Sequence, residues 1–227
     1  MGNISYYDNI AADYDAILNE DKKNINIRNK VADTFISLVK GGKVLDFGGG
    51  TGLDFGWLLQ HRYSITYCEP SVVMRRMAME RKAREFPGSS IFFLEGDLTD
   101  FSKWDVTSPF KQEMNAVLAN FAVFNCIPDI EMLFAKLWLS LEPGGMVLAL
   151  ILDSSLIRRL RINLKGTILS LFSGDPVSFF VDYNGERQMV YIHSVKAIKK
   201  ASGHKFKFIH HERMDGFGFS LIHLIRK

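Results

Sequence analysis

The chain has 227 residues, 47% of them hydrophobic and 23% charged, which suits one α/β domain with a large core. Its formal net charge of +3 is too small to indicate a nucleic-acid surface, and its longest apolar run, Met146 to Leu152, is far too short to span a membrane. The two cysteines lack neighbours at metal-ligand spacing. We therefore expect a cytoplasmic protein with a small-molecule partner and no metal, membrane or nucleic-acid partner; the oligomeric state stays open.

Helix and strand patterns alternate through the first two thirds of the chain. In a leader of residues 1–40, apolar residues recur at helical spacing from Ile27 to Val39 and stop before Gly41-Gly42. A strand begins at Lys43. Further strands are predicted at Ile65–Cys68, Ile91–Glu95, Ala116–Asn120 and Met146–Leu152, and helices at Leu53–Gln60, Ser71–Arg84 and Ile130–Leu141. This order indicates a parallel sheet covered on both faces, with ligands beyond the carboxyl ends of its strands.

The alternation breaks after Asp153. Leu156–Phe172 has the pattern of an amphipathic helix, or of two short ones interrupted at Gly166. Asn184-Gly185 lies between two strand patterns and favours a hairpin, because a type I′ turn needs positive φ at both central residues. We therefore predict a lid-like insert at residues 154–193 over the carboxyl edge of the sheet. The remaining predicted elements are a helix at Ser194–Ala201 ended by Gly203, strands at Lys205–His211 and Phe217–Ile225, and a turn at Asp215-Gly216.

A glycine-rich turn follows the first strand, in Val44-Leu45-Asp46-Phe47-Gly48-Gly49-Gly50-Thr51-Gly52. Glycine at alternate positions allows positive φ and close approach of a ligand. The dinucleotide fingerprint needs another glycine three positions on, but Leu53 follows Gly50 at that distance. The loop therefore suits a nucleoside without a pyrophosphate.

Acidic residues end the next two strands. Glu69 lies 21 residues beyond Gly48, where a carboxylate can accept hydrogen bonds from both ribose hydroxyls; its alternative is an acid at the start of a helix. Asp97, in Gly96-Asp97-Leu98, is placed to accept from an adenine amine, with the Leu98 N–H beside it. Taken alone, Asp97 equally suits a helix cap or a turn.

With these residues in place, the chain resembles the class I S-adenosylmethionine-dependent methyltransferases, especially those that methylate small molecules. The similar motifs are Val44–Gly52, Cys68–Ser71 with Met74, Gly96–Leu98, Asn115–Phe121, Leu141–Met146 and a leader at Tyr7–Asp15. A cysteine is common at Gly49, and we expect this departure to be harmless because the contact there is through backbone. The resemblance implies a three-layer Rossmann-like fold with a seven-stranded, mostly parallel sheet and an antiparallel last strand.

The resemblance also implies which residues hold S-adenosylmethionine. Asp46 and the glycines would hold the methionine part, Glu69 the ribose, and Asp97 with Leu98 the adenine, on which Met74 packs. Arg28 would meet the methionine carboxylate, unless it belongs to a solvated helix face. The full cofactor set is Tyr14, Arg28, Asp46, Gly48, Gly49, Gly50, Thr51, Gly52, Glu69, Pro70, Met74, Asp97, Leu98, Asn120 and Phe121.

Residues for the acceptor are harder to assign. The candidates are Tyr6, Asn125, Asp153 and Tyr191. His193 is a candidate catalytic base; the alternative is that it caps a helix or lies on the surface. Phe121 and Phe124 suit the core better than a substrate platform. His210-His211 point to opposite faces of a strand, which disfavours a metal site, and Arg158, Arg159 and Arg161 suit a solvated helix face.

The predicted function is in-line transfer of a methyl group from S-adenosylmethionine to a small-molecule acceptor. The Asn-Pro-Pro-Tyr signature of enzymes that methylate nucleobase or glutamine amino groups is absent. One alternative is a nicotinamide-dependent oxidoreductase, which would share the ribose acid but lacks the third glycine. The other is a non-catalytic cofactor-binding protein.

Overall fold

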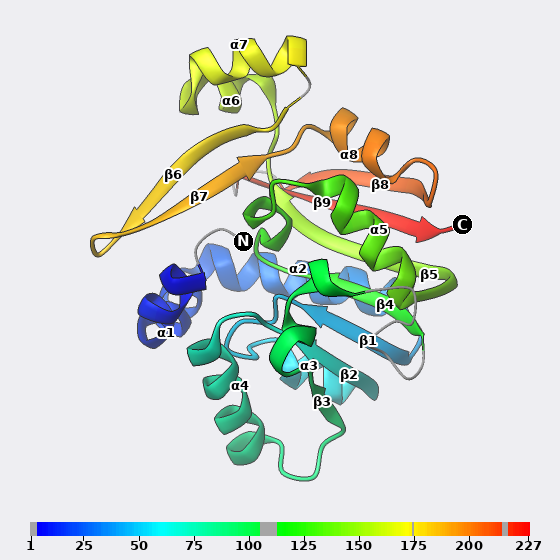
Figure 1. Cartoon of the computed structure of the whole chain (residues 1–227). Helices are drawn as coiled ribbons and strands as arrows, with labels where there is room; N and C mark the ends of the chain where they lie inside the picture. Colours follow the sequence, from blue (N-terminus) through cyan, green and yellow to red (C-terminus); the bar gives the residue numbers. More distant parts are fainter. Residues whose placement is uncertain (1–3, 105–112, 174, 215–217) are drawn as a thin grey trace.

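The computed structural model describes residues 4–104, 113–173, 175–214 and 218–227. They form a seven-stranded sheet in the order β3-β2-β1-β4-β5-β9-β8, with helices on both faces (Figure 1). Its strands are β1 (Gly42–Phe47), β2 (Tyr63–Cys68), β3 (Ile91–Phe93), β4 (Met114–Ala119), β5 (Leu141–Leu152), β8 (Phe206–Met214) and β9 (Phe219–Arg226). The pairs among β1 to β5 are parallel, whereas β9 is antiparallel to both β5 and β8. The predicted fold is confirmed.

Two hydrophobic layers hold the sheet between helices. On one face α5 (Ile130–Ser140) and α8 (Val195–Ser202) pack on β1, β4 and β5 through residues such as Phe134 and Ile198. The other face is covered by α2 (Lys22–Leu38) and α3 (Phe55–Gln60), with Phe35 and Phe55 fully buried. Strands β1 and β4 are buried on both faces, which is why their sequences are almost continuously apolar.

The leader forms α1 (Ile4–Asn19) and α2, and α1 packs against α4 (Val72–Glu85) around Met74. Short 3-10 helices follow β3, η1 (Gly96–Thr99) and η2 (Phe101–Lys103), and one follows β4, η3 (Val123–Cys126). No helix in the described ranges is long and apolar enough to cross a membrane.

The insert consists of α6 (Leu156–Ile162), α7 (Leu164–Ser173) and a separate hairpin of β6 (Val177–Tyr183) and β7 (Glu186–Ile192), which extends toward α1 (Figure 1). The predicted turn is confirmed, since Asn184 and Gly185 have φ of 49° and 82°. The predicted break at Gly166 is wrong: it falls at Asn163, whose side chain accepts from the Gly166 N–H at 2.7 Å and so starts α7. The predicted turn at Asp215-Gly216 lies outside the described residues.

Candidate active site

A cavity of about 260 Å³ opens at the carboxyl ends of β1 to β4, where the sheet topology places a ligand. Its walls come from α1, the glycine loop, the end of β2, the segment after β3 and the segment after β4. The lining residues are Ile4, Tyr7, Tyr14, Phe47, Gly48, Gly50, Cys68, Glu69, Pro70, Met74, Thr99, Asp100, Phe101, Ser102, Phe121, Val123, Cys126, Ile127, Pro128, Asp129 and Met132. Seven of the predicted cofactor residues are among them: Tyr14, Gly48, Gly50, Glu69, Pro70, Met74 and Phe121.

The glycine loop has the backbone that its sequence predicts. Gly48, Gly50 and Gly52 have φ of 73°, 56° and 78°. A Cβ on Gly50 would lie 3.3 Å from the Tyr14 ring, at the cavity wall. At Gly49 the constraint is contact rather than φ, since a Cβ there would lie 2.5 Å from both Asp46 and the buried Tyr67 ring. Side-chain packing therefore favours glycine at this position, and the expectation that the departure from cysteine is harmless stays a prediction.

Glu69 fastens this loop to the end of β2. Its carboxylate accepts from the Gly50 N–H at 3.0 Å and from the Ser71 N–H at 2.8 Å, and only 6% of the residue is exposed. Burial raises the pKa of Glu69 to about 7, although the two backbone hydrogen bonds oppose the shift. Glu69 lines the cavity and each of its oxygens can accept a further hydrogen bond, as hydroxyl donors of a ligand require.

Carboxylates outnumber cations beneath the loop. Asp46 and Asp54 are 1% and 7% exposed, and Arg28 Nε lies 3.5 Å from Asp54 Oδ1. Burial raises the pKa of Asp46 well above its usual range; repulsion by Asp54 and Glu69 adds to the shift and Arg28 opposes it. Asp46 Oδ2 is buried and accepts no hydrogen bond from any described residue. This environment is suited to a positively charged ligand with N–H donors.

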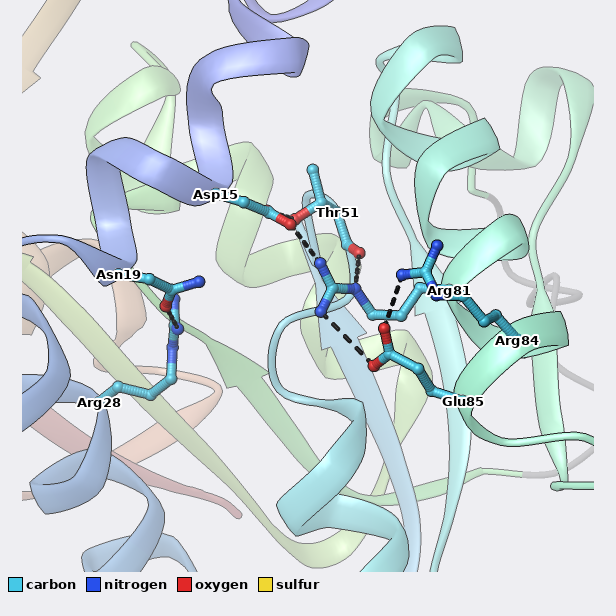
Figure 2. A network of polar contacts seen from close by, with 7 residues as sticks. All are labelled: Asp15, Asn19, Arg28, Thr51, Arg81, Arg84 and Glu85. Carbon is cyan, nitrogen blue, oxygen red and sulfur yellow. Dashed lines mark hydrogen bonds and ion pairs between the residues drawn. The ribbon is translucent and has the colours of Figure 1, made fainter.

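The leader helix is tied to the loop by polar contacts (Figure 2). Asp15 accepts from the Thr51 hydroxyl and pairs with Arg81, whose Nε donates to the Thr51 carbonyl at 3.0 Å. Asp8 lies seven residues before Asp15 on α1 and accepts a hydrogen bond from the Ser71 hydroxyl at 2.6 Å. Thr51 itself is 1% exposed and does not line the cavity. Two aspartates two helical turns apart thus hold α1 in place as one wall of the cavity.

Arg28 is enclosed, so the alternative of a solvated helix face is wrong for it. Its side chain is 13% exposed, donates to Asn19 Oδ1 at 3.0 Å (Figure 2) and lies 5.0 Å from the centre of the Phe121 ring. Arg28 does not line the cavity. Its contact with a methionine carboxylate therefore stays a prediction.

The segment after β4 has a strained backbone. Phe121 and Ala122 have φ of 47° and 65°, a region that non-glycine residues seldom occupy. Asn120 holds it in place by donating to Asp54 Oδ2 at 3.0 Å and accepting from the Phe121 N–H. The Phe121 ring consequently reaches the cavity, whereas Phe124, 1% exposed, is a core residue as predicted.

Three polar side chains from distant segments meet at the cavity wall. Gln188 of β7 donates to the Tyr7 hydroxyl and to Cys126 Sγ, both at 3.0 Å, and Tyr7 lies 3.2 Å from Cys126. Burial raises the pKa of both Tyr7 and Cys126, so the cluster is uncharged. Tyr7 and Cys126 line the cavity and Gln188 supports them from the insert. None of the three was predicted from sequence.

The structure places the residues that were predicted to hold adenine away from the cavity. Asp97 points to solvent with a side chain that is 82% exposed and paired with Lys103, and Leu98 is 40% exposed. Neither lines the cavity; Asp100 and Phe101 do. The displacement arises because the chain after β3 turns through η1 and η2, which carries the later residues back to the sheet edge.

The predicted acceptor residues lie elsewhere as well. Tyr6 packs with Ile10 and Met74 while its neighbour Tyr7 faces the cavity. Asn125 donates to the Tyr191 carbonyl at 2.7 Å and accepts from the Leu152 N–H, and Asp153 pairs with Arg213 at 3.1 Å. None of the four predicted residues lines the cavity, and the bonds of Asn125 and Asp153 explain these two as structural.

His193 is a structural residue too. It is 3% exposed, its Nε2 lies 2.8 Å from the Ile127 carbonyl oxygen, and burial lowers its pKa. It does not reach the cavity, so the geometry gives it no role as a base. The prediction of a solvated face is also wrong for Arg159, which is 7% exposed and donates to Ser170 Oγ. Among the described residues, no group of His, Cys, Asp and Glu is arranged to hold a metal.

A family model described as a methyltransferase domain matches residues 19–210. The chain belongs to this methyltransferase family. Solved structures share its fold. The DhpI-SAH complex matches with a TM-score of 0.69 and 16% identity, covering 99% of this chain and 95% of that one. An S-adenosylmethionine-dependent methyltransferase from Clostridium acetobutylicum ATCC 824 matches with a TM-score of 0.67 and 13% identity, covering 97% of this chain and 98% of that one. A third is the glycopeptide N-methyltransferase MtfA with S-adenosylhomocysteine, with a TM-score of 0.63 and 16% identity, covering 86% of this chain and 88% of that one. No match to a curated protein sequence was found.

Neighbours of this fold hold S-adenosylmethionine or S-adenosylhomocysteine, and the residues present in this chain fit such a cofactor. The unpartnered Asp46 oxygen and the surplus of buried carboxylates suit a ligand with a sulfonium and an ammonium group. Gly50 leaves space that a side chain would fill, and Glu69 can accept from ribose hydroxyls.

Glu69 should make cofactor affinity depend on pH. Hydroxyl donors favour its ionised form, so a carboxyl with a pKa of about 7 must lose its proton when the ligand binds. Affinity for S-adenosylhomocysteine should therefore rise about tenfold from pH 6 to pH 8, as measured by calorimetry. Glu69→Gln should bind more weakly and lose this dependence. An affinity of the unmodified chain that is flat across this range would contradict the assigned role.

Proposed function

We propose that the chain methylates a small-molecule acceptor by in-line displacement in this cavity, beside Tyr7 and Cys126. When bound, S-adenosylmethionine supplies a methyl group already activated by its sulfonium, so the protein needs mainly to align the acceptor and exclude water. The observation that carries the proposal is the Tyr7–Cys126–Gln188 cluster, which joins the leader, η3 and the insert at the cavity wall.

The size and charge of this region support a compact acceptor that is not acidic. The whole cavity measures about 260 Å³, less than most ligand pockets, and the cofactor must share it. The raised pKa values of Tyr7 and Cys126 keep both groups protonated, so they orient an acceptor by hydrogen bonds rather than by charge. None of the cavity's lining residues among the described ranges is an arginine or a lysine, which gives an acidic acceptor no counterion.

Two neighbours of this fold are N-methyltransferases, the glycopeptide N-methyltransferase MtfA and NodS from Bradyrhizobium japonicum, which supports methyl transfer as the reaction. We propose the cytoplasm as its location, in agreement with two free cysteines.

Ligand binding and turnover test the proposal separately. S-adenosylhomocysteine at about 100 times its Kd should stabilise the chain by about 2.7 kcal/mol and raise its Tm by roughly 5–10 °C, whereas NADH should have no effect. Methyl transfer should then be measured by mass spectrometry on a panel of small phenols, amines and thiols, with an unrelated protein and an oligonucleotide as competing acceptors. No melting shift would contradict the cofactor site. A shift accompanied by transfer only to protein or nucleic acid would contradict the acceptor class.

A further inference from the structure

Helix α7 buries its polar face and exposes its apolar face. Its buried side chains are polar: Thr167 is 0% exposed and Ser170 is 7% exposed. Its solvent-facing side chains are Leu164, Ile168, Leu169 and Leu171, which are 60%, 47%, 60% and 59% exposed. A helix on the surface of a globular domain normally has the reverse arrangement, with its apolar stripe toward the core. The exposed face of α7 therefore needs an apolar partner that the described chain does not provide.

The neighbouring helix extends this surface. On α6, Leu156 and Ile157 are 49% and 66% exposed. The α6–α7 surface, defined by these six leucines and isoleucines, gathers six exposed apolar side chains within 16 consecutive positions, whereas an ordinary surface has them singly scattered. Its inner side is held by Arg159, which donates to Ser170 Oγ, and by Asn163, which donates to the Ser178 carbonyl at 3.1 Å.

The charge of the same segment identifies the partner. Residues 156–173 contain four basic residues and no aspartate or glutamate. Two of them, Arg161 and Lys165, are exposed beside the apolar side chains. A second copy of the chain docked on this surface about a two-fold axis would bring these like charges together. An anionic bilayer complements both features, because apolar side chains enter the acyl boundary while lysine and arginine contact the headgroups.

We propose that the α6–α7 surface docks the enzyme on the surface of an anionic lipid bilayer. The two helices lie at one end of the molecule, beyond the hairpin and away from the sheet (Figure 1), where a flat surface can reach them. No described residue of α6 or α7 lines the cavity, so docking leaves the cofactor site free. The expectation of no membrane partner rested on the absence of a spanning run in the sequence, which does not bear on a helix lying in the interface.

Vesicle sedimentation tests this directly. The full chain should pellet with vesicles of equal parts phosphatidylcholine and phosphatidylglycerol, and should stay in the supernatant with pure phosphatidylcholine or in high salt. Leu169→Glu and Arg161→Glu should each weaken binding to the anionic vesicles about tenfold or more. The matched control is Leu38→Glu, an exposed leucine on α2 (43%), which should bind like the unmodified chain.

Each variant is also measured for S-adenosylhomocysteine affinity and Tm, which should be unchanged, so that failure of docking and failure of the cofactor site are distinguishable. Equal sedimentation with anionic and neutral vesicles, or none with either, would overturn the proposal. So would a concentration-dependent dimer in gel filtration that Leu169→Glu dissociates, because the surface would then bind a second copy.

Discussion

Gly50→Val is expected to abolish S-adenosylhomocysteine binding at concentrations that saturate the unmodified chain. Gly50 has a φ of 56°, and a Cβ there would lie 3.3 Å from Tyr14 and 3.9 Å from Met74, both of which line the cavity. The two methyl groups of valine would extend into the ligand space. Overpacking of about 3 kcal/mol corresponds to a Kd raised about a hundredfold, which calorimetry measures.

Gly88→Val is the matched control for backbone strain. Gly88 has a φ of 79°, and a Cβ there would have no heavy atom within 4 Å. Both variants therefore incur a left-handed backbone cost of roughly 1–2 kcal/mol, and the Tm lost by Gly88→Val measures that cost alone. Only Gly50→Val should lose affinity. Normal binding by a folded Gly50→Val chain would mean that the loop is a structural turn rather than part of the cofactor site.

Replacing residues 156–191 with a short Gly/Ser linker is expected to eliminate methyl transfer while the chain retains cofactor binding. Every described residue that lines the cavity lies between Ile4 and Met132. The replacement removes Gln188, however, and with it the hydrogen bonds that orient Tyr7 and Cys126. Folding is checked by circular dichroism, affinity by calorimetry and transfer by mass spectrometry. Unchanged transfer to the same acceptor would contradict the role of the insert.

Gln188→Leu tests the same role without a deletion. Loss of two buried hydrogen bonds of about 1–3 kcal/mol each in a partly buried site should lower kcat/KM about tenfold or more, with S-adenosylhomocysteine affinity unchanged. Gln60→Leu, at the exposed end of α3, is the matched control and should behave like the unmodified chain. If both variants transfer methyl groups equally well, the cluster does not position the acceptor.

Sequence alone determined the features that local chemistry controls. The glycine loop, the hairpin turn at Asn184-Gly185 and the acid at the end of β2 each depend on a few adjacent residues, through positive φ or a strand terminus. The alternation of buried strands and helices determined the parallel sheet in the same way, because burial on both faces requires apolar residues at consecutive positions.

Tertiary structure decided which side chains reach the cavity. Tyr6 and Tyr7 are equivalent candidates in sequence, but adjacent helix positions point about 100° apart, so the docking of α1 selects Tyr7. Asp100 lines the cavity in place of Asp97. The sequence could not predict this, because side chains in an irregular turn follow no periodic pattern of direction. Gln188 and Tyr7 are 181 positions apart, and no local pattern links them. Helix α7 has an ordinary amphipathic sequence; only its packing shows that the apolar face is turned outward, because periodicity identifies a face but not the surface that covers it.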